Sequence, residues 1–214
     1  DDAFPFGASR EIDLGYSTVR ATRITYVGEL GWELYVPVEF AVGVYELLFE
    51  AGAEFDVARG GYYAIESMRL EKGYRAFGRE LTPDHNPVEA GLQFACKLKS
   101  SIDFLGRAAV EKVRAQGPRR RLVGLQVDSP EAMLWGGELI LRDGVAAGQV
   151  TSAAWGEAAG ACVGLAYVWD PAGKPVDISW LRAGSYSVNV GGELFAITIA
   201  LKALYDPTNE RIRS

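Results

Sequence analysis

The sequence has little of what most metal, disulfide and nucleotide sites need. Its 214 residues include two cysteines and one histidine. Cys96 and Cys162 belong to no C-x-x-C pair, which argues against a zinc site and against a disulfide framework. No G-x-G-x-x-G, P-loop or G-x-S-x-G motif is present, so the sequence supports no dinucleotide site, phosphate loop or hydrolase elbow. His85 lies in a proline-bounded loop, where we expect a solvated side chain.

Positive charge and long apolar runs are also scarce. Lys and Arg number 22 against 28 Asp and Glu, which gives a net charge of −6. Nucleic-acid phosphates need a basic face, so we expect no nucleic-acid partner. No apolar run reaches the roughly 20 residues of a membrane helix, and no signal peptide is visible. We therefore expect no membrane partner, and a cytoplasmic protein, or a mitochondrial matrix protein if the source is eukaryotic.

The first half of the chain mixes strand and helix patterns. A hydrophobic content of 49% and this length suit one or two globular domains. Apolar spacing and glycine punctuation predict the elements that follow. They are a strand pair within 19–37, helices over 40–52, 63–72 and 106–116, and a strand over 92–98.

The pattern changes after Gly117-Pro118. Short alternating segments separated by glycine-rich turns indicate a small antiparallel barrel. The predicted fold is therefore α+β, with an antiparallel-sheet body over 1–117 followed by a β-barrel domain over 118–214. The strands predicted for the barrel are 122–127, 138–141, 146–150, 162–169, 175–181, 187–190 and 195–201, with an Asp143-Gly144 turn between the second and third.

The most informative segment runs from Tyr26 to Pro37, with the sequence YVGELGWELYVP. Glycines at both ends of Gly28–Gly31 predict a hairpin in which Tyr26 faces Glu33. Strand alternation places Tyr35 on the same face as Glu33, and Leu34 on the other. That face suits a flat heteroaromatic ligand rich in N–H donors, although an ordinary solvated sheet face would have the same pattern.

This segment resembles the Y-x-G-E-x-G-x-E motif of the glycine cleavage T-protein (aminomethyltransferase) family. Further matches extend the resemblance over almost the whole chain in the right order. The form AIES-RLEKGYRAFGRELTP is similar to the folate domain of sarcosine and dimethylglycine dehydrogenases. Where free-standing T-proteins usually carry an Arg-Asp pair, this chain has Ile65-Glu66. The other matching segments are 63–83, 86–92, 104–107 and 204–211.

The resemblance implies a tetrahydrofolate cofactor and names the residues that would contact it. The family uses a glutamate at the position of Glu33 to hold the pterin, with Tyr26 at the position of its aromatic partner. Leu34 and Tyr35 would line the same pocket. Relatives place a folate-contacting aromatic at Phe94, yet the alternation of Leu92, Phe94, Cys96 and Leu98 equally predicts a core position.

The resemblance also implies what lies outside this sequence. The family's catalytic aspartate would be upstream of Asp1, so no catalytic residue is predicted here, and the chain would be a C-terminal piece of a longer protein. The missing N-terminal half of its own domain would complete the folate site. In the dehydrogenase branch an FAD domain oxidises a small N-methyl amine, and folate takes the carbon. The alternatives are a stand-alone aminomethyltransferase and a non-catalytic interaction module that has lost folate.

Overall fold

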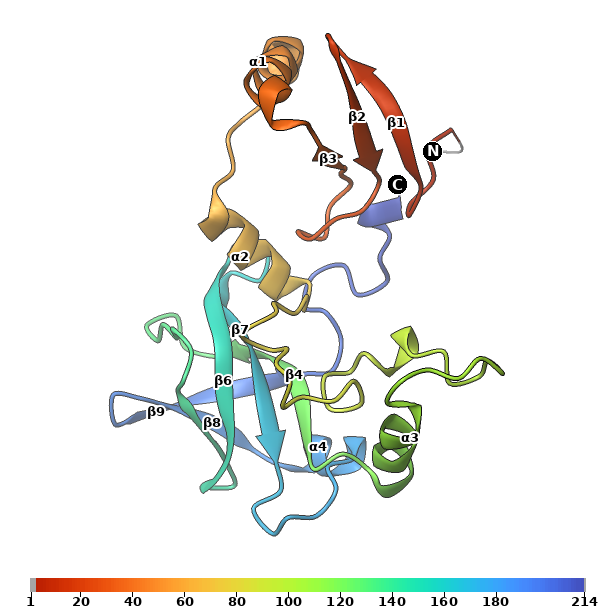
Figure 1. Ribbon diagram of the computed structural model, residues 1–214. Coiled ribbons are helices and arrows are strands. Elements are labelled where there is room, and N and C mark those ends of the chain that lie inside the picture. The colour runs from red at the N-terminus through yellow and green to blue at the C-terminus, as the bar shows by residue number, and fades with distance from the viewer. Residues whose placement is uncertain (1–2, 214) are drawn as a thin grey trace. The chain divides into compact units, whose positions relative to one another are not determined.

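The structure is a computed structural model that describes residues 3–213 (Figure 1). Its contacts divide the chain into two compact units. Unit 1 holds the residues up to Glu66 together with those from Asp206 onward, and unit 2 runs from Ser67 to Tyr205.

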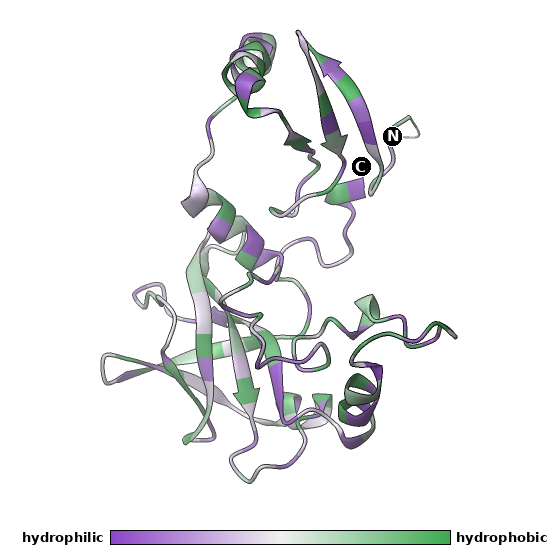
Figure 2. Ribbon diagram, in the orientation of Figure 1, coloured by the Kyte–Doolittle hydropathy of each residue, from purple (hydrophilic) through white to green (hydrophobic). Residues whose placement is uncertain are grey.

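Unit 1 is a three-stranded antiparallel sheet with a helix beside it (Figure 1). The strands β1, β2 and β3 are neighbours in that order. Residues in β2 alternate between buried Ser17, Val19 and Ala21 and the exposed side chains between them, so one face is solvated. Purple and green bands alternate along β1 and β2 in Figure 2. The elements are β1 Ser9–Leu14, β2 Ser17–Thr22, β3 Glu33–Tyr35, α1 Ala41–Gly52 and short 3₁₀ turns at Val38–Phe40, Ala53–Phe55 and Arg211–Arg213.

The predicted hairpin is wrong in its pairing. Glu33 lies opposite Thr22 of β2, not opposite Tyr26. The Thr25 hydroxyl accepts hydrogen bonds from the backbone N–H groups of Val27 and Gly28, each at 3.2 Å, and these bonds fold the segment into a turn. β3 therefore pairs with the strand that precedes the turn. The strand β1 was not predicted.

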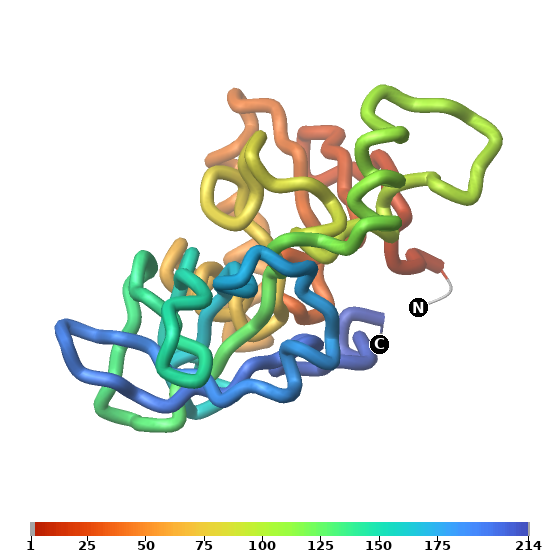
Figure 3. The backbone as a smooth tube through the Cα atoms, turned by 90° about the horizontal axis from the view of Figure 1, so that it is seen from below, coloured from red at the N-terminus to blue at the C-terminus, as the bar shows by residue number. Residues whose placement is uncertain are grey.

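Unit 2 contains a closed antiparallel barrel, as the sequence predicted. Its strands close in the order β4-β7-β6-β5-β8-β9, and Figure 3 follows their backbone from below. The core includes Leu125, Ile140, Val168 and Val188, each of which is 0% exposed. The elements are α2 Tyr62–Glu71, whose last residues enter unit 2, a 3₁₀ turn at Gln93–Ala95, α3 Arg107–Gln116, β4 Arg120–Val127, β5 Leu139–Arg142, β6 Val145–Gly156, β7 Ala161–Trp169, α4 Ile178–Ala183, β8 Tyr186–Val190 and β9 Glu193–Ala200.

Two predicted strands of unit 2 are wrong. Residues 175–181 contain the start of α4, because the Asp177 side chain accepts the Trp180 N–H at 2.7 Å and caps a helix. Residues 92–98 form turns whose hydrogen bonds are local, such as that from Cys96 N–H to the Gln93 carbonyl. Phe94 is 81% exposed, so the predicted core face does not form there.

A buried ion pair ties the end of α2 to the barrel. Arg69 and Glu80 are both 0% exposed, and their side chains meet at 2.8 Å. Arg69 also donates to the Ser152 hydroxyl of β6 at 2.9 Å. The Glu80 carboxylate accepts from Ser152, from the Thr151 hydroxyl at 2.7 Å and from the Ala76 N–H at 2.8 Å. Together with the bond from Arg69, these hydrogen bonds join the end of α2 and the loop that follows it to β6, which is distant in sequence.

His85 lies against the barrel and is half-buried, which corrects the expectation of a solvated side chain. Its ring stacks on Tyr167 of β7 with centroids 4.2 Å apart and planes at 8°. Its Nδ1 atom lies 3.0 Å from the Thr82 hydroxyl. Burial and the Arg120 charge lower the pKa of His85, whereas burial raises the pKa of Tyr167 to about 12.

The predicted fold class is confirmed: an α+β chain with an antiparallel sheet followed by a closed β-barrel. The predicted helices over 40–52, 63–72 and 106–116 are present with ends shifted by about one residue. The division into domains at 117/118 stays a prediction.

Candidate functional site

The candidate site is the solvated face of the unit 1 sheet. Because successive side chains of a strand point to opposite faces, Glu33 and Tyr35 share this face. The strand register then places Arg20 beside Tyr35, and Thr22 beside Glu33. On the far side of β2, Glu11 of β1 lies opposite Arg20. Glu33, Glu11, Arg20 and Tyr35 thus bring two carboxylates, one guanidinium and one phenol within a few strand positions of one another on this face.

Hydrogen bonds within this face leave one carboxylate oxygen available. The Tyr35 hydroxyl donates to Oε2 of Glu33 at 3.1 Å. Within residues 3–213, Oε1 of Glu33 accepts no hydrogen bond. Arg20 donates to Glu11 at 2.8 Å, so its charge is already paired. The hydrogen bond to the Glu33 carboxylate, with the negative charge of that group, raises the pKa of Tyr35, because both favour the protonated phenol.

The structure separates two of the predicted pocket residues. Leu34 points to the face opposite Tyr35, where it pairs with buried Ala21. Both residues nevertheless border a shallow groove along β3 that also touches Arg20 and Pro37. Leu34 can therefore contribute only from the edge of the strand.

Tyr26 and Phe94 lie outside the sheet. Tyr26 is 38% exposed and belongs to the turn between β2 and β3. Phe94 belongs to unit 2, in the 3₁₀ turn Gln93–Ala95. The structure thus groups Glu33 and Tyr35 on one face and places the other three predicted residues elsewhere.

Sequence reasoning missed Arg20, Thr22 and Glu11 as neighbours of the predicted residues. The alternation in residues 17–22 does indicate which of them share a face. Their approach to Glu33 and Tyr35 depends on the pairing of β3 with β2, which the predicted hairpin had placed elsewhere.

Residues 3–213 contain neither a candidate metal site nor a candidate membrane-spanning helix. No group of three or more His, Cys, Asp or Glu side chains is arranged to hold a metal ion there. In the same residues, no helix has both the length and the apolar character to cross a bilayer.

Comparison with protein families matches nearly the whole chain. The family described as "GCVT N-terminal domain" matches residues 1–100, and "Glycine cleavage T-protein C-terminal barrel domain" matches residues 120–206. The chain belongs to the glycine cleavage T-protein family. The second match covers the observed barrel from the start of β4 to beyond the end of β9.

Two curated relatives of this T-protein chain are dehydrogenases. Mitochondrial sarcosine dehydrogenase of Mus musculus is 42% identical over 213 residues, which are 100% of this chain and 23% of the relative. Mitochondrial dimethylglycine dehydrogenase of Homo sapiens is 34% identical over 215 residues, which are 100% of this chain and 24% of the relative. The chain thus spans about a quarter of the length of these relatives.

A solved structure supports the T-protein fold. The glycine cleavage system aminomethyltransferase T from Bartonella henselae superposes with a TM-score of 0.81 at 24% identity. The match covers 97% of this chain and 54% of that one. At this identity the likeness establishes the fold.

Proposed function

We propose that this chain binds tetrahydrofolate within a longer enzyme that transfers a one-carbon unit. The observation that carries the proposal is the Glu33 carboxylate, whose Oε1 accepts no hydrogen bond within the described residues, beside the Tyr35 ring on an exposed sheet face. These residues lie in the segment that matches the family's Y-x-G-E-x-G-x-E motif.

The chemistry of these two side chains fits a reduced pterin. One edge of a pterin carries adjacent N–H donors, and an ionised carboxylate accepts such donors in short, strong hydrogen bonds. The 59% exposed Tyr35 ring offers an aromatic surface next to that carboxylate. Its hydroxyl also holds Glu33 in place through Oε2, which leaves Oε1 for the ligand.

The other predicted contacts have lesser parts in the proposal. Tyr26 would approach the ligand from the turn before β3, and Leu34 from the edge of that strand. Phe94 rests on the family resemblance. Its exposed ring is consistent with a ligand contact and not with a core position.

The parent protein would be a sarcosine- or dimethylglycine-dehydrogenase-like oxidoreductase, because the relatives with those names match the chain over its full length. FAD outside this chain would supply the oxidation of a small N-methyl amine. This chain would bind and orient the folate that accepts the carbon. A cytoplasmic location, or the matrix in a eukaryote, goes with this proposal.

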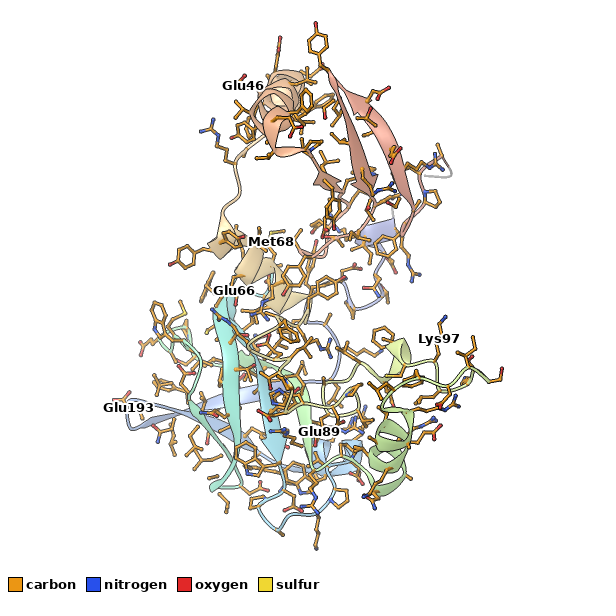
Figure 4. The ribbon with its side chains drawn as sticks, viewed as in Figure 1. Glu46, Glu66, Met68, Glu89, Lys97 and Glu193 are labelled. Carbon is orange, nitrogen blue, oxygen red and sulfur yellow. The ribbon has the colours of Figure 1, made fainter. Side chains whose placement is uncertain are left out.

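The test compares Glu33→Gln with Glu46→Gln in the intact protein. Glu46 lies on α1, away from β3, and its replacement makes the same chemical change at an exposed site (Figure 4). A neutral amide presents an N–H group to the donors of the pterin. Loss of a hydrogen bond to a charged group costs about 1.5–3 kcal/mol, so tetrahydrofolate should bind on the order of 10- to 100-fold more weakly.

Titration calorimetry gives the dissociation constant for each variant. The proposal requires Glu46→Gln to match the wild type while Glu33→Gln weakens binding. Equal constants for all three proteins would remove Glu33 from the site. A wild-type protein that does not bind tetrahydrofolate would favour the interaction-module alternative, and transfer from a lipoyl carrier without a flavin would favour the stand-alone aminomethyltransferase.

A further inference from the structure

A basic groove lies in unit 2 and contains none of the residues of the unit 1 sheet face; of the proposed folate contacts it includes only Phe94. It has a volume of about 700 Å³ and lies between the segment Gln93–Ser100 and α3. Lys97, Lys99 and Arg114 supply its charge, and Phe94 lines it as well. The yellow-green segment before α3 extends away from the barrel in Figures 1 and 3, and Figure 4 labels Lys97 on it.

One arginine holds the wall of this groove in shape. The Arg107 guanidinium donates to the carbonyl oxygens of Leu98, Ser100 and Ile102 at 2.9, 2.8 and 3.1 Å. It also pairs with Glu111 one turn along α3 at 2.9 Å. With five N–H donors in a fixed fork, one guanidinium can fasten several carbonyls at once. The segment is therefore preorganised although it contains no strand or long helix.

The three cations that line the groove are not used within the described residues. Lys97, Lys99 and Arg114 are exposed, and in residues 3–213 none of their side chains makes an ion pair or hydrogen bond. The groove is therefore locally basic on a chain whose net charge is −6. An 81% exposed Phe94 ring stands beside them.

We propose that this groove docks an acidic segment of a partner protein. A compact anion would need buried donors that converge on one point, whereas these cations are solvated and separate. Several carboxylates on one linear chain can reach all three cations, and an apolar side chain of the same segment can cover Phe94. Nucleic acid does not fit, because three cations on an acidic chain give little phosphate affinity.

The test uses a fluorescent, acetylated peptide of glutamates with one central phenylalanine, titrated with the intact protein that contains this chain. The double variant Lys97→Glu and Lys99→Glu is compared with Lys174→Glu and Lys202→Glu, which changes the net charge equally at exposed lysines elsewhere in unit 2. Because each exposed pair contributes modestly, reversing two charges should weaken binding about tenfold more than the control does. Phe94→Ala should weaken it severalfold, and added salt should weaken it further.

Thermal unfolding of each variant, followed by circular dichroism, checks that these surface changes leave the fold intact. Equal affinities of the groove variant and the control variant would overturn the proposal. So would equal binding of a peptide in which lysines replace the glutamates. An oligo-γ-glutamate that binds as tightly as the peptide, with no effect of Phe94→Ala, would assign the groove to a small polyanionic tail and also overturn it.

Discussion

The buried pair of Arg69 and Glu80 makes the sharpest prediction about stability. The Glu80 carboxylate accepts all four of its hydrogen bonds. Glu80→Gln replaces one of its oxygens by an NH₂ group, which is a donor and would face those donors without an acceptor. It also leaves the fully buried Arg69 charge without its partner. Removing one member of a buried pair costs about 3–5 kcal/mol, a large part of the roughly 5–15 kcal/mol that stabilises a typical domain.

Urea unfolding followed by tryptophan fluorescence measures this loss in the unit that contains the pair. Four of the five tryptophans lie in unit 2, and Trp32→Phe removes the remaining one. Glu111→Gln is the matched control in the same unit, because it breaks the Arg107 pair, whose side chains are 22% and 48% exposed. An exposed pair of this kind is worth at most about 1 kcal/mol. Equal costs for Glu80→Gln and Glu111→Gln would refute the reasoning.

The same pair predicts the direction of the acid response. Burial by itself raises the pKa of Glu80, but hydrogen bonds from Ser152, Ala76 and Thr151, with the Arg69 charge, hold it below its ordinary value of 4.5. A carboxyl group whose pKa is lower in the folded than in the unfolded state stabilises the fold at a pH above its unfolded-state pKa. This stabilisation is lost as the pH falls through the folded-state pKa. The free energy of unfolding of the wild type should therefore fall more steeply below about pH 4.5 than that of Arg69→Met/Glu80→Leu.

Three further outcomes are expected. Gly156→Ala places a Cβ 2.7 Å from Oε1 of Glu71 and 3.0 Å from Val163, so it should destabilise the fold by about 1–3 kcal/mol. Gly43→Ala in α1 meets no atom within 4 Å and should stabilise the fold by about 0.5–1 kcal/mol. Thermal melts in which both variants shift stability in the same direction would contradict this. NMR titration of His85 should give a pKa below 6.5, with stability lost as the pH falls through that range and the dependence absent in His85→Phe; a raised value would contradict the stacked geometry. Trypsin should cut first after Arg59, in the exposed segment 56–61 between α1 and α2. Arg120 and Arg121 are protected by comparison, because they lie in β4 and their side chains are hydrogen-bonded. First cleavage at 119–121 would instead favour the division at 117/118.

Local patterns in the sequence predict much of the barrel correctly. Alternation and the Asp143-Gly144 turn identify β5 and β6, since a hairpin turn needs the positive φ angles of 52° and 81° that these two residues adopt. The failure at 175–181 is also local in origin, because the Asp177 cap outweighs a weak apolar alternation.

The candidate site is only partly predictable, because local patterns determine which residues share a strand face but do not determine which strand β3 pairs with. That Glu33 and Tyr35 share a face follows from the twofold period of a strand, and the hydrogen bond between them agrees with it. The prediction that Tyr26 lies opposite Glu33 fails because the Thr25 hydroxyl competes for backbone N–H groups and turns the chain early.

The sequence by itself determined the family, the α+β class, the barrel, and the face that carries Glu33 and Tyr35. Each of these depends on motifs or on periods of two and 3.6 residues, which are properties of neighbouring positions. Only the tertiary structure decided that Arg69 meets Glu80 and that His85 stacks on Tyr167. The partners in these contacts are 11 and 82 positions apart, and no local rule couples them. They meet because barrel closure brings β6 and β7 against the end of α2 and the 74–85 loop, where buried charges and N–H groups must find partners.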